Sequence, residues 1–237
     1  RIFHYHWASV PPRIIPNMNT PVRPEHSGLP SQVWLASRSP RRLELLQTLG
    51  LQVQVFLAQS SPEAEALEAP FEHEDPLLYV QRVTQLKLNA ALEAMRTQKL
   101  SGLVLAADTT VALSGIILGK PENAAQAFQM LQSLSNTTHE VHTAVAGAWL
   151  HIDGSTTATR STVQTSHVEF TKLPETFLYA YINSGEPFDK AGAYGIQGIA
   201  GQYVRHISGS HSGIMGLPLF ETSELIRQLQ TAAQNRN

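Results

Sequence analysis

The chain has 237 residues, of which 42% are hydrophobic, and contains no cysteine, which excludes disulfides, thiolate metal sites and a cysteine nucleophile. Its formal net charge of −2 provides no basic field that would hold a long nucleic acid. No apolar run approaches the roughly 20 residues that span a bilayer, and no signal-peptide pattern is present. We therefore expect a cytoplasmic protein whose partners include neither a membrane nor a long nucleic acid.

Residues 1–30 differ from the rest of the chain in composition. They contain six prolines, at positions 11, 12, 16, 21, 24 and 30, without helical or strand periodicity. Because proline fixes φ and removes a hydrogen-bond donor, we interpret 1–30 as a disordered N-terminal extension and 31–237 as one domain. A start at Met18 and a partner-binding role for the extension both stay open.

The hydrophobic pattern predicts alternating strands and helices from residue 33 onward. Ser39 is a suitable N-cap, and Pro40 a suitable first residue, for a helix that Gly50 ends. In chain order the pattern predicts a strand at 33–36, a helix at 40–49, a strand at 53–57, an acidic loop at 60–75 and a long helix at 76–99.

The second half of the chain mixes hairpin strands with helices. A buried-type strand at 103–107 ends at Asp108, and a hairpin about Ser114 and Gly115 follows at 109–118. Farther along we expect a helix at 122–134, strands at 141–152 and 157–170, a helix at 174–183, a glycine-rich loop region at 185–216 and a last helix at 217–230. This order indicates an α/β fold with one twisted mixed sheet and flanking helices.

The segment from Ser37 to Arg42 suggests an anion site. Arg41 and Arg42 would occupy the first turn of a helix, where a cation costs roughly 0.3–1 kcal/mol. A bound anion would make the two arginines favourable at this position, because free N–H groups at a helix start bind phosphate and arginine adds bidentate donors. The alternative is an exposed, capped helix with two solvated arginines.

Asp108 follows an apolar strand, where α/β proteins place their ligands. A lone aspartate there also serves often as a turn cap. Lys120 lies beyond the hairpin, but Pro121 and the glycine spacing exclude a P-loop. Lys87 lies in the long helix, and solvated surface positions are the ordinary explanation for both lysines.

The glycine-rich segment 185–198 is hard to explain as plain structure. Its glycines permit positive φ or close approach of the backbone to a ligand. Asp189 and Lys190 add charge, and Gln197 offers one donor and one acceptor that can pair with a base edge. A structural Asp189–Lys190 pair in an ordinary loop is the alternative.

Taken together, these segments resemble the Maf family. The matching segments are 35–42, 107–109, 119–121, 134–135 with 139–145, 186–198 and 216–218. The resemblance extends from about residue 33 to the C-terminus. It implies a two-lobed α/β fold, shared with inosine-triphosphate pyrophosphatases, with a cleft between the lobes.

The resemblance also implies roles for single residues. The family's catalytic and metal-associated aspartate falls on Asp108. A divalent cation, Mg²⁺ or Mn²⁺, would be held by Asp108 together with Glu63 or Glu65, which compete because the alignment is loose there. Substrate-binding groups are expected at Ser37, Arg41, Arg42, Lys87, Thr109, Lys120, Asp189, Lys190 and Gln197.

The implied activity is hydrolysis of a nucleoside triphosphate to the monophosphate and pyrophosphate, in the service of nucleotide-pool cleansing. Arg41, Thr109 and Gln197 match relatives that act on dTTP and UTP, and differ from relatives that act on 7-methyl-GTP. Alternatives are a pyrophosphatase for modified or purine nucleotides and a regulator of septum formation that acts by binding partners. A homodimer is compatible with either role.

Overall fold

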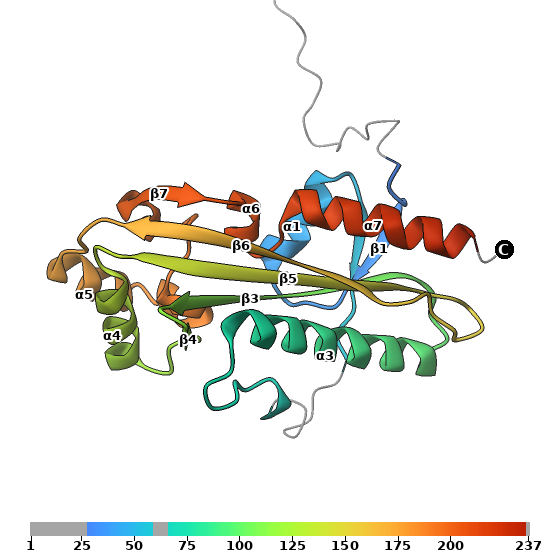
Figure 1. Ribbon diagram of the computed structural model, residues 1–237, viewed down its shortest axis with the longest axis horizontal. Coiled ribbons are helices and arrows are strands. Elements are labelled where there is room, and N and C mark those ends of the chain that lie inside the picture. Colours follow the sequence, from blue (N-terminus) through green and yellow to red (C-terminus); the bar gives the residue numbers. More distant parts are fainter. Residues whose placement is uncertain (1–27, 59–65, 236–237) are drawn as a thin grey trace, which may run out of the picture.

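The computed structural model describes residues 28–58 and 66–235, which form a mixed α/β fold around one seven-stranded sheet (Figure 1). Its strands are β1 (Gln32–Leu35), β2 (Gln52–Val55), β3 (Gly102–Leu113), β4 (Ile116–Leu118), β5 (Thr138–Leu150), β6 (Arg160–Phe170) and β7 (Val204–Ser208). Its helices are α1 (Pro40–Thr48), α3 (Pro76–Thr97), α4 (Ala124–Leu134), α5 (Glu175–Asn183), α6 (His211–Met215) and α7 (Leu219–Gln234). The expected α/β fold with a mixed sheet and flanking helices is confirmed.

The strands follow the order β2-β1-β3-β5-β6-β7, with β4 paired to β3 outside this path. β1 is parallel to both β2 and β3, and every other pairing is antiparallel. The long strands β3, β5 and β6 run through the whole molecule and connect its two ends (Figure 1).

Helix starts follow the capping signals in the sequence. The Ser39 side chain accepts a hydrogen bond from Arg42 N at the start of α1, and Pro40 is the first helical residue. At the start of α3, Asp75 accepts from Leu77 N and Leu78 N. Both caps satisfy N–H groups that a helix leaves unpaired, so the position of each helix is set locally.

Three clusters of buried side chains form the core. One lies beneath α1 and α7 and includes Leu46 and Ile226. The second lies on the opposite face of the same half of the sheet, beneath α3, and includes Leu88 and Met95. The third lies at the other end of the long strands, beneath α4 and α5, and includes Tyr181. Among the described residues, no helix is long and apolar enough to cross a membrane.

Two sequence-based expectations about elements were wrong. Asp108 does not end a strand, because β3 continues to Leu113 and pairs with β5 from Gly102 to Ala112. The region 185–216 is not mainly loop, since it contains strand β7, helix α6 and the 3-10 turns η1 (Glu186–Asp189), η2 (Ala191–Ala193) and η3 (Ile199–Tyr203). β7 lacks the apolar alternation of the longer strands because its side chains are half-buried or exposed.

The sheet has a gap beside the middle of β3. The pairing of β1 with β3 ends where Ala36 N donates to Leu105 O. The pairing of β4 with β3 begins only at Val111. Between these points β3 pairs with β5 alone among the described strands, and this gap holds Asp108 and Thr109.

Candidate active site

A cleft of about 940 Å³ opens at the gap in the sheet. It is lined by the start of α1, by α3, by the middle of β3 and by the glycine-rich segment. All the sequence-predicted substrate residues contribute to its wall: Ser37, Arg41, Arg42, Lys87, Thr109, Lys120, Asp189, Lys190 and Gln197, together with Asp108. Glu63 and Glu65 lie outside the described residues.

The wall of the cleft carries an excess of positive charge, although the whole chain is slightly acidic. Its cations are Arg38, Arg41, Arg42, Lys87, Lys120 and Lys190, and its carboxylates are Glu68, Asp108 and Asp189. Clefts lined by one sign of charge attract ligands of the opposite sign. The cleft therefore suits an anion that bears several charges.

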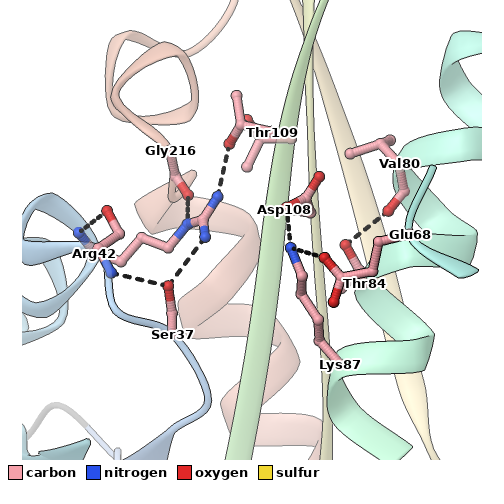
Figure 2. A network of polar contacts seen from close by, with 11 residues as sticks. Ser37, Arg42, Glu68, Val80, Thr84, Lys87, Asp108, Thr109 and Gly216 are labelled. Atoms are coloured by element: carbon pink, nitrogen blue, oxygen red, sulfur yellow. Dashed lines mark hydrogen bonds and ion pairs between the residues drawn. The ribbon is translucent and has the colours of Figure 1, made fainter. Parts of the chain in front are cut away.

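Arg42 is held at the base of the cleft by three hydrogen bonds (Figure 2). Its Nε donates to Gly216 O at 2.9 Å, its Nη1 to Ser37 Oγ at 3.1 Å and its Nη2 to Thr109 Oγ1 at 3.2 Å. Burial lowers the Arg42 pKa, partly offset by the charge of Asp108, yet a guanidinium stays protonated. The alternative of a solvated arginine is wrong for Arg42, and two of its five N–H groups stay available to a ligand.

Lys87 lies between two carboxylates. Its Nζ is 2.6 Å from Asp108 Oδ1 and 3.2 Å from Glu68 Oε2. The three side chains converge from α3, β3 and the segment before α3 (Figure 2). Only 27% of the Lys87 side chain and 15% of the Asp108 side chain are exposed, so neither the surface-lysine nor the turn-cap interpretation describes this pair.

Glu68 is a site residue that sequence reasoning missed. It lies among six acidic residues between 63 and 75, and nothing in their spacing distinguishes it from its neighbours. The segment that carries it is fixed by Arg82, whose guanidinium donates to both carboxylate oxygens of Glu74 at 2.7 Å and to Ala69 O at 2.9 Å. The same guanidinium stacks on Phe71, 4.0 Å from the ring centre.

The glycine-rich segment forms the opposite wall. Lys190 Nζ donates to Asp189 Oδ1 and to Glu186 O, each at 2.6 Å, so the structural pairing of Asp189 with Lys190 is present within a cleft wall. Burial raises the Asp189 pKa, but the hydrogen bond and charge of Lys190, with Arg41, outweigh it and lower the pKa overall. Arg41 and Asp189 thus attract each other.

Two glycines of the segment lie very close to neighbouring side chains. A Cβ at Gly198 would lie 1.7 Å from Glu186 Oε1. Gly192 has φ of +67° and its Cβ position is 2.9 Å from Val111. Glycine is therefore required at position 192, where φ is positive and Val111 is close, whereas a side chain at position 198 would displace the Glu186 carboxylate.

Buried tyrosines support the same segment from below. Tyr194 Oη lies 2.7 Å from His139 Nε2, and both side chains are buried. Tyr181 Oη donates to Glu186 Oε1 at 3.0 Å and accepts from Gly195 N at 3.3 Å. Sequence reasoning missed His139, Tyr181 and Tyr194 as site supports because they resemble ordinary core residues.

Gln197, Lys120 and Arg41 lie nearer the mouth of the cleft. Gln197 and Lys120 are exposed, and Arg41 is half-buried. None of the three forms a salt bridge or side-chain hydrogen bond with the described part of the chain. Their polar groups are therefore free to contact a ligand.

The arrangement can hold a polyanion and activate water beside it. Cations from three directions can neutralise phosphate oxygens, which is the main requirement of phosphoryl chemistry. Asp108 supplies a carboxylate at the centre of the cleft. Asp108 and Glu68 are oxygen donors of the kind that Mg²⁺ and Mn²⁺ prefer, although no group of three or more acidic or histidine ligands occurs in the described part of the chain.

The chain is similar to a family model and to several known proteins. A family model described as Maf-like protein matches residues 32–229. The dTTP/UTP pyrophosphatase of Albidiferax ferrireducens is 47% identical over 82% of this chain and 95% of its own. That of Cupriavidus metallidurans is 49% identical over 84% and 96%. A crystal structure of a nucleoside-triphosphatase (dITP/XTP pyrophosphatase) from Mycobacterium abscessus aligns with 86% of the chain and 96% of its own, at 13% identity and a TM-score of 0.36.

Proposed function

The chain belongs to the Maf family, and from this premise we propose that it hydrolyses nucleoside triphosphates, preferentially dTTP and UTP, to the monophosphate and pyrophosphate. The observation that carries the proposal is the cleft in which Asp108 lies among cationic side chains. Such a site suits a triphosphate. The reaction cleanses the nucleotide pool, and we place it in the cytoplasm, where these nucleotides are used.

The phosphate chain would be bound by Arg42, Lys87 and Lys120. Arg42 offers two free N–H groups from a position that its three hydrogen bonds fix. Lys87 approaches from α3 and Lys120 from beyond β4, so the three cations surround the phosphates from different elements. Pre-positioned positive charge stabilises the charge that develops during phosphoryl transfer.

Asp108 would orient the attacking water and accept its proton. The water oxygen bonds to the α-phosphorus, and the bond from that phosphorus to the bridging oxygen breaks. Pyrophosphate leaves with the electrons of that bond. Lys87, 2.6 Å from Asp108 Oδ1, holds the carboxylate in place before the attack.

A divalent cation fits the residues that are present. Asp108 and Glu68 already converge on one positive charge, the Lys87 ammonium. These two carboxylates, with phosphate oxygens of the substrate, would hold Mg²⁺ or Mn²⁺, while Glu63 and Glu65 stay candidates outside the described residues. When bound, the ion would neutralise phosphate charge and lower the pKa of bound water.

Preference for dTTP and UTP is supported by the 47% and 49% identity of this chain to relatives named dTTP/UTP pyrophosphatase and by the position of Gln197. Gln197 is exposed at the rim of the cleft. Its amide can donate to the O4 acceptor and accept from the adjacent N3–H of thymine or uracil.

The test is a nucleotide panel with purified protein and Mg²⁺. Incubation with dTTP, UTP, GTP, ATP and 7-methyl-GTP, followed by chromatography, should show monophosphate and pyrophosphate as products, formed fastest from dTTP and UTP. Asp108→Asn should abolish turnover while it leaves the melting curve close to wild type. Diphosphate together with orthophosphate would refute the reaction.

A further inference from the structure

A chain of hydroxyl groups connects Arg42 to the interior of the protein. Arg42 Nη2 is 3.2 Å from Thr109 Oγ1 on β3, which is 3.0 Å from Thr143 Oγ1 on β5. Thr143 Oγ1 in turn lies 2.8 Å from the carbonyl oxygen of Gly213 in α6. Thr143 is fully buried, so its contact with Gly213 O is shielded from water, whereas Thr109 is half-buried in the cleft wall.

The direction of every proton in this chain is determined. A carbonyl oxygen can only accept, so the single hydroxyl proton of Thr143 is donated to Gly213 O. Thr109 must therefore donate its own proton to Thr143 Oγ1. Arg42 has only donors, so it donates to Thr109, and the chain runs one way from the guanidinium to Gly213.

The chain is closed into a ring by a second contact. Arg42 Nε donates to Gly216 O at 2.9 Å, three residues beyond Gly213. Gly216 ends α6 with φ of +120°, a backbone conformation that L residues rarely adopt. Residues 213–216 therefore hold the guanidinium at two nitrogens. Gly216 O accepts directly from Nε, and Gly213 O is connected to Nη2 through Thr143 and Thr109.

We propose that Thr143 is a positioning residue for phosphate binding, and that Thr109 acts with it through Arg42. The inference rests on the proposed function for its account of what Arg42 binds. Thr109 has no proton left to donate to a nucleotide. Through Arg42 its effect reaches the phosphate chain, which every nucleotide carries, so the proposal predicts the same effect for every base.

The test measures binding of inorganic pyrophosphate with Mg²⁺ by calorimetry, which needs no turnover. Thr143→Val, which keeps the shape and removes the hydroxyl, should weaken binding about tenfold, equivalent to about 1.4 kcal/mol. Thr143→Ser should restore binding to within about twofold, because it keeps the hydroxyl. The double variant Thr109→Val/Thr143→Val should bind pyrophosphate as tightly as the weaker-binding of the two single variants, because both substitutions break the same chain of hydrogen bonds.

Thr222→Val is the matched control. Thr222 is fully buried in α7 and its hydroxyl has no hydrogen-bond partner among the described residues, so its removal should leave pyrophosphate binding unchanged. Wild-type binding by Thr143→Val, failure of Thr143→Ser to restore it, or additive losses in the double variant would each overturn the proposal.

Thr109→Val provides a second, independent measurement if Thr143→Val does not fold. The KM for dTTP, UTP and GTP should rise by the same factor, with the ranking of nucleotides unchanged. A changed ranking would show that Thr109 contacts the base and would overturn the proposal. A wild-type protein that binds pyrophosphate but hydrolyses no nucleotide would refute the proposed function alone.

Discussion

Lys87 Nζ lies 2.6 Å from Asp108 Oδ1, so a helix and the central strand meet at the cleft through one charged hydrogen bond. Successive side chains along β3 point to opposite faces of the sheet. Asp108 points to the α3 side, where Lys87 lies, while Thr109 points to the Arg42 side (Figure 2). One strand therefore positions a carboxylate and an arginine support at the same gap in the sheet.

Lys87→Met should reduce kcat for dTTP by roughly a hundredfold, because one pre-positioned donor to developing phosphate charge is lost. Methionine keeps the apolar stem packed against α3 and β3. The control is Lys172→Met, an exposed lysine outside the cleft, which should retain wild-type kcat. Steady-state kinetics on both variants make the comparison, and equal kcat values would remove Lys87 from the mechanism.

The sequence predicted the residues of the cleft better than the residues that support them. Arg42, Asp108 and Lys190 lie in short polar or glycine-rich segments that an ordinary core does not need. Thr143 and Tyr194 look like routine strand or core residues, and their partners are 34 and 55 positions away. Long-range pairing of this kind leaves no local signal.

The placement of Asp108 shows the same limit for the fold. The apolar run at 103–107 looks like a complete strand, because a charged residue follows it. The strand continues because β5 pairs with it from Gly102 to Ala112, a tertiary contact that outweighs the local pattern. The cap at Ser39 could be predicted since it acts on an N–H group only three residues away.

Glu68→Gln should raise the Mg²⁺ concentration that gives half-maximal activity by about tenfold or more, because a charged oxygen ligand becomes neutral. The exposed Glu72 provides a control, and Glu72→Gln should leave that concentration unchanged. Glu63→Gln and Glu65→Gln belong in the same series. Full activity of the wild-type enzyme in excess EDTA would exclude a metal requirement, and a shift confined to Glu63 or Glu65 would assign the ligand there.

Arg82→Met should loosen the segment that carries Glu68. The substitution removes the paired bonds to Glu74 and the bond to Ala69 O, while the rest of α3 keeps its packing. We expect faster hydrogen exchange across 66–75. We also expect a higher Mg²⁺ concentration for half-maximal activity, as for Glu68→Gln. Arg96→Met, near the other end of α3, is the control. Unchanged exchange across 66–75 would show that Arg82 does not fix the segment.

His139 should make the protein less stable in mild acid. Burial lowers the His139 pKa to about 4 from its ordinary 6.5, so between these pH values the unfolded chain binds a proton that the folded chain does not. Its contribution to stability is fully present above pH 6.5 and is lost as pH falls toward 4, by about 3 kcal/mol in all.

Urea unfolding of the wild type at pH 7 and at pH 5 measures the part of that loss that occurs above pH 5, and His139→Gln should reduce the difference between the two free energies of unfolding because glutamine does not titrate. His206→Gln, at an exposed position on β7, should keep the wild-type difference. The same pH response in wild type and His139→Gln would show that His139 is not the group responsible.

Gln197→Glu should lower kcat/KM for dTTP and UTP by about tenfold or more, with the melting curve unchanged because Gln197 is exposed. The amide that donates to O4 is replaced by an acceptor with negative charge, and a buried polar atom that loses its partner on binding costs about 1–3 kcal/mol. Gln202→Glu is the matched control, since Gln202 is an exposed glutamine outside the cleft wall.

Inorganic pyrophosphate lacks a base, so its binding should be nearly equal in wild type and Gln197→Glu. If the ranking of nucleotides survives in Gln197→Glu, Gln197 does not contact the base, and the preference for thymine and uracil must be set elsewhere in the cleft.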